Sequence, residues 1–173
     1  MSNKQITINH YLLTELISDE LKFLIACCQI KPTPADIEEI HTQIKNYKVK
    51  SKNWQNIIAL ANTHGVLPLV YKTIKNLSQY DNGSSLNAER LTLNAFLSEL
   101  KAHYQNIAQR NILMSAELIR IMKLLEDNGI KTLAFKGPTL AQMVYGDITL
   151  RQFGDLDILI KKKDLQKVNK LSQ

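Results

Sequence analysis

The sequence predicts an α+β protein in which a mostly helical N-terminal region with a long spine helix precedes a partial α/β core. Apolar residues recur at helical spacing through most of residues 1–128. Beyond Gly129 the pattern changes to two short apolar segments, 130–135 and 155–160, with the length of strands. We therefore expect a helical domain over residues 1–128 and an α/β unit over residues 129–173.

Four helices are expected in the first half of the chain. Their predicted ranges are 12–29, from 34 onward, 53–64 and about 68–77. Thr33 is a suitable N-cap for the second helix, with Pro34 at its first position. Gly65 is a suitable C-cap for the third. The polar segment 79–85, which contains Asp81-Asn82-Gly83, predicts a loop after the fourth.

A long helix is expected from Asn87 to Asn128. Its apolar seam alternates spacings of three and four and comprises Leu93, Leu97, Leu100, Tyr104, Ile107, Asn111, Met114, Leu118, Ile121 and Leu125. The seam serves either as a spine that the other helices cover or as a dimer interface, and a break near residues 109–111 is a further alternative. We interpret Asn111 as a register or hydrogen-bonding device within it.

The α/β unit begins with the strand at 130–135, which runs into Lys136-Gly137-Pro138 and then a short helix over Thr139 to Tyr145. Gly137 permits a close backbone approach or an unusual φ, and Pro138 suits the start of a helix. The free N–H groups of a helix N-terminus bind phosphate well. This turn is therefore a candidate phosphate site, although a purely structural turn has the same geometry.

The second strand, 155–160, carries Asp155 and Asp157, and another helix is expected from Lys163. Residues i and i+2 of a strand share one face, so the two carboxylates would point the same way and repel each other without a cation between them. Oxygen-only ligands of this kind suit Mg²⁺. The alternative is that both are exposed residues on a half-buried strand.

Several of these residues occur in an order known from one family. They are Lys136-Gly137, Tyr145-Gly146-Asp147, Arg151 and Asp155-Leu156-Asp157, preceded by the helical segment from Ala61 to Leu69. In this order they resemble the bacterial uncharacterised nucleotidyltransferase family of the polymerase-β-like nucleotidyltransferase superfamily, over residues 54–165. One departure is Pro138, which stands where the superfamily often has a serine that contacts phosphate; Thr139 or Lys136 would have to substitute.

The resemblance implies a partial nucleotidyltransferase core that transfers a nucleoside monophosphate from an NTP to an unknown hydroxyl acceptor, with two Mg²⁺ ions. The implied roles are catalysis and metal binding by Asp155 and Asp157, and nucleotide or phosphate binding by Lys136, Gly137, Thr139 and Arg151. Two of these have bland alternatives: Lys136 as a solvated side chain, and Arg151 as an ion-pair partner of Asp147 or Asp155.

The superfamily pattern also implies a third carboxylate on a later strand. After Asp157 the only acidic residue is Asp164, which is too close in sequence to lie on a separate strand. We therefore expect a chain shortened before the third carboxylate, whose activity is incomplete. The alternative function is a non-catalytic helical interaction or dimerisation module that retains a degenerate nucleotidyltransferase remnant.

The composition limits the expected cellular location of the protein and the classes of partner that it binds. The net charge of +6 is modest, and without an aromatic and basic platform we do not expect nucleic acid as a partner. No apolar run is long enough to span a membrane. Adjacent Cys27 and Cys28 are expected to be reduced, buried thiols, which suits a cytoplasmic location. A homodimer is possible through the seam of the long helix.

Overall fold

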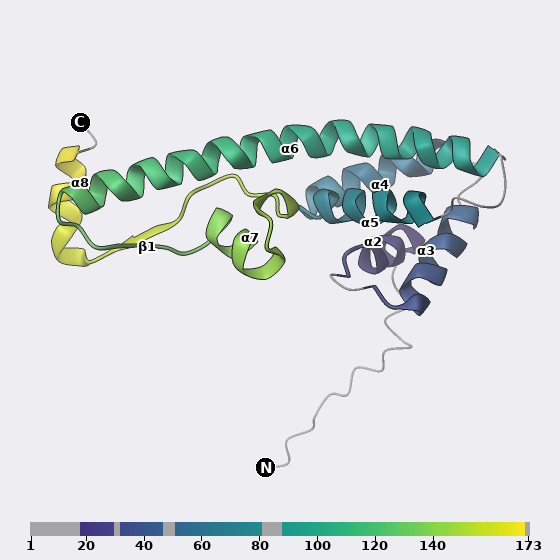
Figure 1. Cartoon of the computed structure of the whole chain (residues 1–173), viewed down its shortest axis with the longest axis horizontal. Coiled ribbons are helices and arrows are strands. Elements are labelled where there is room, and N and C mark those ends of the chain that lie inside the picture. Colours follow the sequence, from purple (N-terminus) through teal and green to yellow (C-terminus); the bar gives the residue numbers. More distant parts are fainter. Residues whose placement is uncertain (1–17, 30–31, 47–50, 81–87, 172–173) are drawn as a thin grey trace, which may run out of the picture.

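The computed structural model describes residues 18–29, 32–46, 51–80 and 88–171. Its elements are α2 (Asp19–Cys27), α3 (Pro34–Asn46), α4 (Ser51–Thr63), α5 (Leu67–Tyr80), α6 (Ala88–Asp127), β1 (Thr132–Ala134), α7 (Gly137–Tyr145), η2 (Ile148–Leu150), β2 (Ile158–Ile160), η3 (Lys162–Asp164) and α8 (Leu165–Leu171). Figure 1 shows α6 along the whole molecule, with α2–α5 beside its N-terminal half and β1, α7 and α8 beside its C-terminal half. The architecture is α+β, as the sequence predicts.

Local capping signals place the first helices. Ser18 is extended (φ −64°, ψ 157°), and its hydroxyl accepts a hydrogen bond from the N–H of Leu21, so α2 begins at Asp19 and the expected helix is not continuous through Ser18. The rest of that expected helix, residues 12–17, lies outside the described residues. At α3, Thr33 Oγ1 accepts from the N–H of Asp36 as predicted, and Asp36 accepts from the N–H of Thr33 in return.

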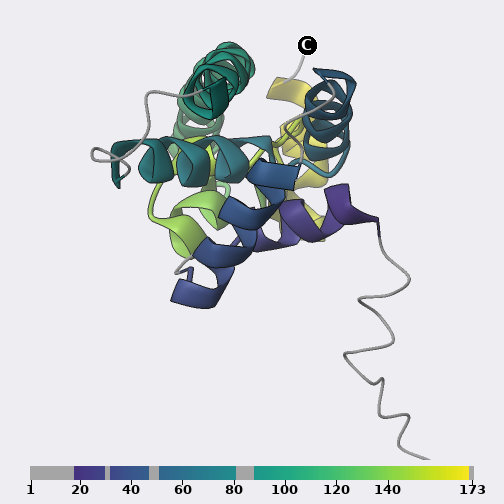
Figure 2. The same cartoon turned by 90° about the vertical axis from the view of Figure 1, so that its right-hand side faces the viewer.

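The helical half encloses one apolar core. Phe23, Ile57, Val70, Ile74 and Leu100 are fully or almost fully buried in it. The indole ring of Trp54 also stacks on Phe96 with ring centroids 4.1 Å apart, which joins α4 to α6. The end-on view of Figure 2 shows the shorter helices gathered around one side of α6. The α5 helix continues to Tyr80, so residues 79 and 80 are helical and not part of the expected loop, and residues 81–85 lie outside the described residues.

The two cysteines at the end of α2 are free thiols, as expected; Cys27 is buried as predicted, whereas Cys28 is only half-buried. Burial raises the pKa of the Cys27 thiol well above its ordinary value, and burial raises the pKa of Cys28 to about 11. Both sulfur atoms are therefore protonated near neutral pH, where a thiol is a poor nucleophile and a poor metal ligand.

The seam of α6 packs within the chain. Leu93, Leu97, Tyr104 and Ile107 pack against the helical core, while Leu118 and Leu125 are buried farther along the helix. The helix is continuous from Ala88 to Asp127, without the alternative break at 109–111. This is the spine arrangement, because the same helix packs against α5, η2, β1 and α7. A homodimer stays a prediction.

The two strands form a small antiparallel sheet. Thr132 pairs with Ile160, Leu133 with Leu159 and Ala134 with Ile158. Both strands are three residues long, shorter than the expected 130–135 and 155–160. Asp155 and Asp157 consequently lie in the segment before β2 and not within the strand, although the N–H of Phe135 still donates to the carbonyl of Asp157 at 3.0 Å.

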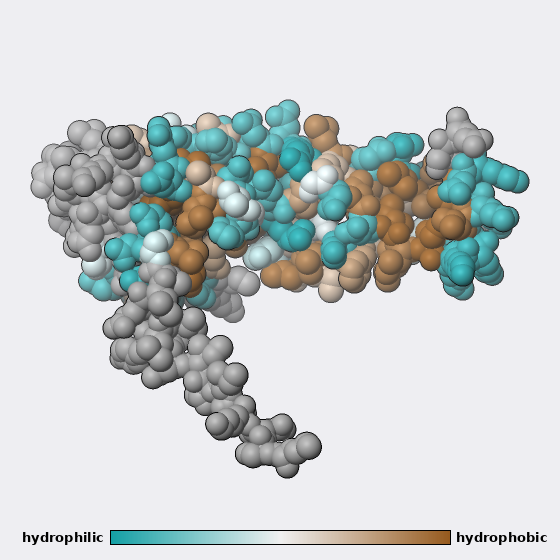
Figure 3. Space-filling view, turned by 180° about the vertical axis from the view of Figure 1, so that it is seen from behind, coloured by the Kyte–Doolittle hydropathy of each residue, from teal (hydrophilic) through white to brown (hydrophobic). Residues whose placement is uncertain are grey.

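Exposed apolar side chains gather at the sheet end of the molecule. Figure 3 shows hydrophobic surface over this end of the rear face. On the sheet, the large exposed apolar side chains include Leu133 of β1, Phe135 just after it and Leu159 of β2. Ile112 and Ile119 of α6 are exposed as well. Among the described helices, none combines the length and the apolar character required to cross a membrane.

Candidate active site

Gly137 forms the turn between β1 and α7 and is buried. Its φ is +55°, a left-handed conformation that favours glycine. A Cβ atom at this position would lie 3.3 Å from the backbone oxygen of Asp155. The glycine therefore brings the α7 N-terminus directly against the segment that carries the two candidate carboxylates.

The N-terminus of α7 receives no side-chain cap. Lys136 occupies the N-cap position without a side-chain hydrogen bond to the helix, and Pro138 lies in the first turn. Thr139 follows it and is half-buried. An uncapped helix N-terminus presents backbone N–H groups and a partial positive charge, both of which suit an anionic group.

The Lys136 side chain lies near Asp157. Its Nζ atom is 4.0 Å from Oδ2 of Asp157 and 5.6 Å from the centre of the Phe135 ring. The Lys136 side chain is about half exposed, so this ion pair contributes little to stability. Lys136 is thus a cation beside the candidate metal ligands, and neither purely solvated nor locked in place.

The loop from Asp147 to Gly154 is attached to α6 by side chains that the sequence did not single out as site residues. Arg110 Nη2 donates to the carbonyl of Phe153 at 2.7 Å. Asn111 Nδ2 donates to the carbonyls of Ile148 and Arg151, both at 2.8 Å, and Asn111 is buried. The hydrogen-bonding interpretation of Asn111 is confirmed, with loop carbonyls as its partners.

Tyr104 adds a third attachment to this loop. Its hydroxyl lies 2.9 Å from Thr149 Oγ1. Thr149 Oγ1 in turn donates to Oδ1 of Asp147, so the Tyr104 hydroxyl is the donor to Thr149. The Tyr104 ring also stacks on Tyr71 of α5, with centroids 4.4 Å apart. The loop is thereby connected to the helical half of the molecule.

Arg151 and Asp147 are not partners of each other. Asp147 caps η2 by accepting the N–H of Thr149, and Arg151 makes no ion pair with Asp147 or Asp155 in the described part of the chain. The Arg151 side chain is half-exposed, and its backbone carbonyl is held by Asn111. Its guanidinium group therefore has unused hydrogen-bond donors.

The described residues contain no group of three or more His, Cys, Asp or Glu side chains arranged to hold a metal ion. Asp164, the remaining acidic residue after Asp157, is buried in η3. The protein groups that could bind a metal ion at this site are thus the carboxylates of Asp155 and Asp157. Mg²⁺ is commonly held by one or two carboxylates together with substrate phosphates and water, so the pair fits that ion when phosphate is also present.

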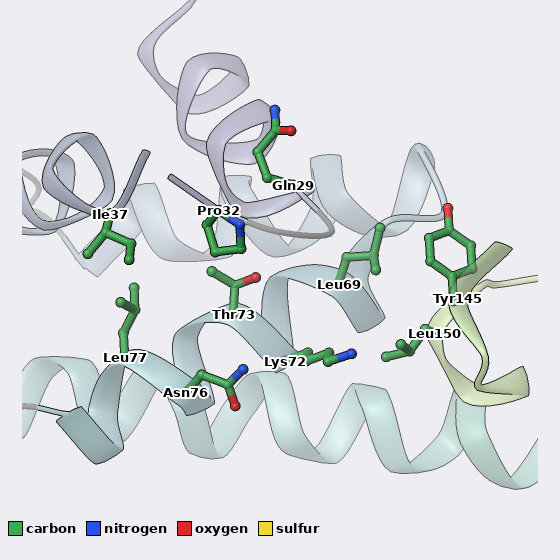
Figure 4. A pocket seen from close by; sticks show the side chains of 10 residues that line it. All are labelled: Gln29, Pro32, Ile37, Leu69, Lys72, Thr73, Asn76, Leu77, Tyr145 and Leu150. Atoms are coloured by element: carbon green, nitrogen blue, oxygen red, sulfur yellow. The ribbon is translucent and has the colours of Figure 1, made fainter. Parts of the chain in front are cut away.

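A cavity of about 320 Å³ lies elsewhere, between α5, residues at the start of α3 and before it, and the C-terminal end of α7. Figure 4 shows Lys72 and Thr73 of α5 facing it, with Tyr145 and Leu150 at one end. Tyr145 ends α7, whereas Gly137 begins it, so this cavity is not the candidate phosphate site.

Comparison with models of protein families gives a match over most of the chain. The family model described as "Uncharacterised nucleotidyltransferase" matches residues 50–171, which includes α4–α6 as well as the strands and α7. Searches of curated proteins and of solved structures found no significant match.

Proposed function

Because the chain belongs to the uncharacterised nucleotidyltransferase family, we propose that it binds an NTP with Mg²⁺ and transfers a nucleoside monophosphate to a hydroxyl acceptor. The observation that carries the proposal is the contact at Gly137, where the uncapped N-terminus of α7 lies against the backbone of Asp155. The proposed phosphate-binding turn therefore lies next to the chain segment that carries the two proposed metal ligands.

The triphosphate would bind at the α7 N-terminus. Backbone N–H groups after Gly137 and the hydroxyl of Thr139 would donate hydrogen bonds to the β- and γ-phosphates. Lys136 and Arg151 would neutralise phosphate charge, because neither has a strong partner within the described residues. These four residues act by binding and orientation.

Asp155 and Asp157 would hold two Mg²⁺ ions. Bound metal would supply charge neutralisation at the phosphates and Lewis-acid polarisation. In the proposed reaction, the acceptor oxygen forms a bond to the α-phosphorus, the bond between that phosphorus and the bridging oxygen breaks, and pyrophosphate leaves. The hydroxyl proton goes to a third carboxylate, which we place on a partner chain or on a part of the polypeptide outside the described residues.

Replacement of the two carboxylates tests this proposal. We expect Asp155→Asn and Asp157→Asn each to weaken Mg²⁺-dependent NTP binding by at least about 10-fold, since even outer-shell groups of metal sites contribute that much. Calorimetric titration of the four common NTPs, with Mg²⁺ or with EDTA, measures the effect. Asp127→Asn, at the exposed end of α6, is the matched control. The proposal would be refuted if the wild type bound NTP equally well with Mg²⁺ and with EDTA. It would also be refuted if both variants bound NTP as tightly as the wild type.

A non-catalytic interaction module is the second candidate function. The exposed apolar side chains Leu133, Phe135 and Leu159 at the sheet favour it, because clustered apolar residues on a surface mark interaction sites. NTP binding that is unaffected by the Asp155 and Asp157 variants, with no pyrophosphate release, would favour this candidate over the enzyme.

A further inference from the structure

The loop that leads to Asp155 is held from two sides. On one side, the guanidinium group of Arg110 donates to the carbonyl of Phe153. On the other side, the turn at Gly137 lies against the backbone oxygen of Asp155. The backbone from Phe153 to Asp155 is therefore held between α6 and the start of α7.

Gly154 makes the first of these contacts possible. A Cβ atom at Gly154 would lie 2.9 Å from Nη2 of Arg110, closer than real Cβ atoms come to a neighbour, so the end of the flexible Arg110 side chain would have to move. The guanidinium group thus occupies the space where any other residue would place its side chain. The glycine directly before Asp155 and the arginine on α6 form one complementary pair.

The attachment is made by a rigid element. Arg110 and Asn111 are neighbours near the middle of a continuous 40-residue helix, and both donate only to backbone carbonyls of the loop. A bond to a main-chain carbonyl fixes the path of the loop whatever its side chains do. Arg110 is itself exposed, so its loss should move the loop without unfolding the core.

We propose that Arg110 is a positioning residue: through the carbonyl of Phe153 it sets where Asp155 presents its carboxylate to the metal and nucleotide. This inference rests on the proposed function. It assigns α6, which lies outside the phosphate turn and the Asp-x-Asp segment, a direct part in the geometry of the site. Arg110 acts through the backbone of the loop and needs no contact with substrate.

Three variants of the whole chain test the inference. Arg110→Met keeps the aliphatic stem and removes the donors, whereas Arg110→Lys keeps a donor and the charge. Arg120→Met removes an exposed arginine of the same helix that pairs with Glu117. Calorimetry with the Mg²⁺ complexes of the four common NTPs gives affinity, and hydrogen–deuterium exchange over residues 150–157 reports on the loop without any nucleotide.

We expect Arg110→Met to weaken Mg²⁺–NTP binding about 10-fold, the scale of groups that orient metal ligands, and to speed exchange in 150–157 alone. Arg110→Lys should keep most of the wild-type NTP affinity and most of the protection from exchange. Arg120→Met should match the wild type in both measurements. Unchanged exchange in Arg110→Met, or changed exchange with wild-type affinity, would overturn the positioning role. If the wild type binds no NTP, the proposed function fails and the positioning role fails with it, while the exchange data still show whether Arg110 fastens the loop.

Discussion

Gly137→Ala is expected to weaken Mg²⁺-dependent NTP binding by at least about 10-fold while leaving the helical core folded. The alanine would have to adopt a φ of +55°, which costs an L-residue about 1–2 kcal/mol. Its Cβ atom would also lie 3.3 Å from the carbonyl oxygen of Asp155, so the candidate metal-ligand segment must shift away. Calorimetric NTP titration and thermal unfolding measure the two effects.

Gly146→Ala distinguishes the effect of backbone strain in α7 from the effect of the new contact with Asp155. Gly146 ends the same helix, has a φ of +67° and has no atom within 4 Å of its hypothetical Cβ. This control therefore pays the backbone strain and makes no contact with the Asp155 segment. Similar losses of NTP affinity in both variants would mean that strain in α7, and not the contact at Gly137, governs the site.

Asn111→Leu is expected to lower the free energy of unfolding by about 2 kcal/mol, because two backbone carbonyls, those of Ile148 and Arg151, lose their hydrogen-bond donor. The leucine has the same number of side-chain heavy atoms and the same branching, although it is larger, and it keeps the seam apolar. It also removes Asn111 Oδ1, a buried atom without a hydrogen-bond partner among the described residues, which limits the net loss. Urea unfolding followed by circular dichroism measures the change.

Asn106→Leu on the same helix is the matched control. Asn106 is exposed, so this substitution should change the free energy of unfolding by less than about 0.5 kcal/mol. An Asn111→Leu variant that is as stable as this control would show that the bonds to the loop carry no net stability. The spine role of α6 would then rest on its apolar residues alone.

Much of the fold was predictable because its signals are local. The Thr33 cap, the positive φ at the Gly65 C-cap and the unbroken seam of the long helix each depend on neighbouring residues and are confirmed. The turn at Gly137 was predictable for the same reason. The strand ends were less predictable, because pairing with the partner strand decides where a strand stops.

The support of the candidate site was not predictable from spacing. The side-chain hydrogen bonds of Tyr104, Arg110 and Asn111 join residues that are 37 to 45 positions apart in the sequence. The sequence around a polar residue on a helix does not indicate which distant residue it will contact. Only Asn111 gave a signal, as a lone amide in an apolar seam. Gly154 gave no signal of this kind, because the sequence does not show that the side chain of Arg110 lies over it.

The most direct test of the account is to locate the metal. Mn²⁺ would replace Mg²⁺ in a titration of isotope-labelled protein with a non-hydrolysable NTP, and paramagnetic broadening of amide signals would be followed by NMR. The account predicts broadening that centres on Gly137, Asp155 and Asp157 and spares α2–α5. Broadening elsewhere, or none at all at saturating nucleotide, would contradict the assignment of Asp155 and Asp157 as the metal site.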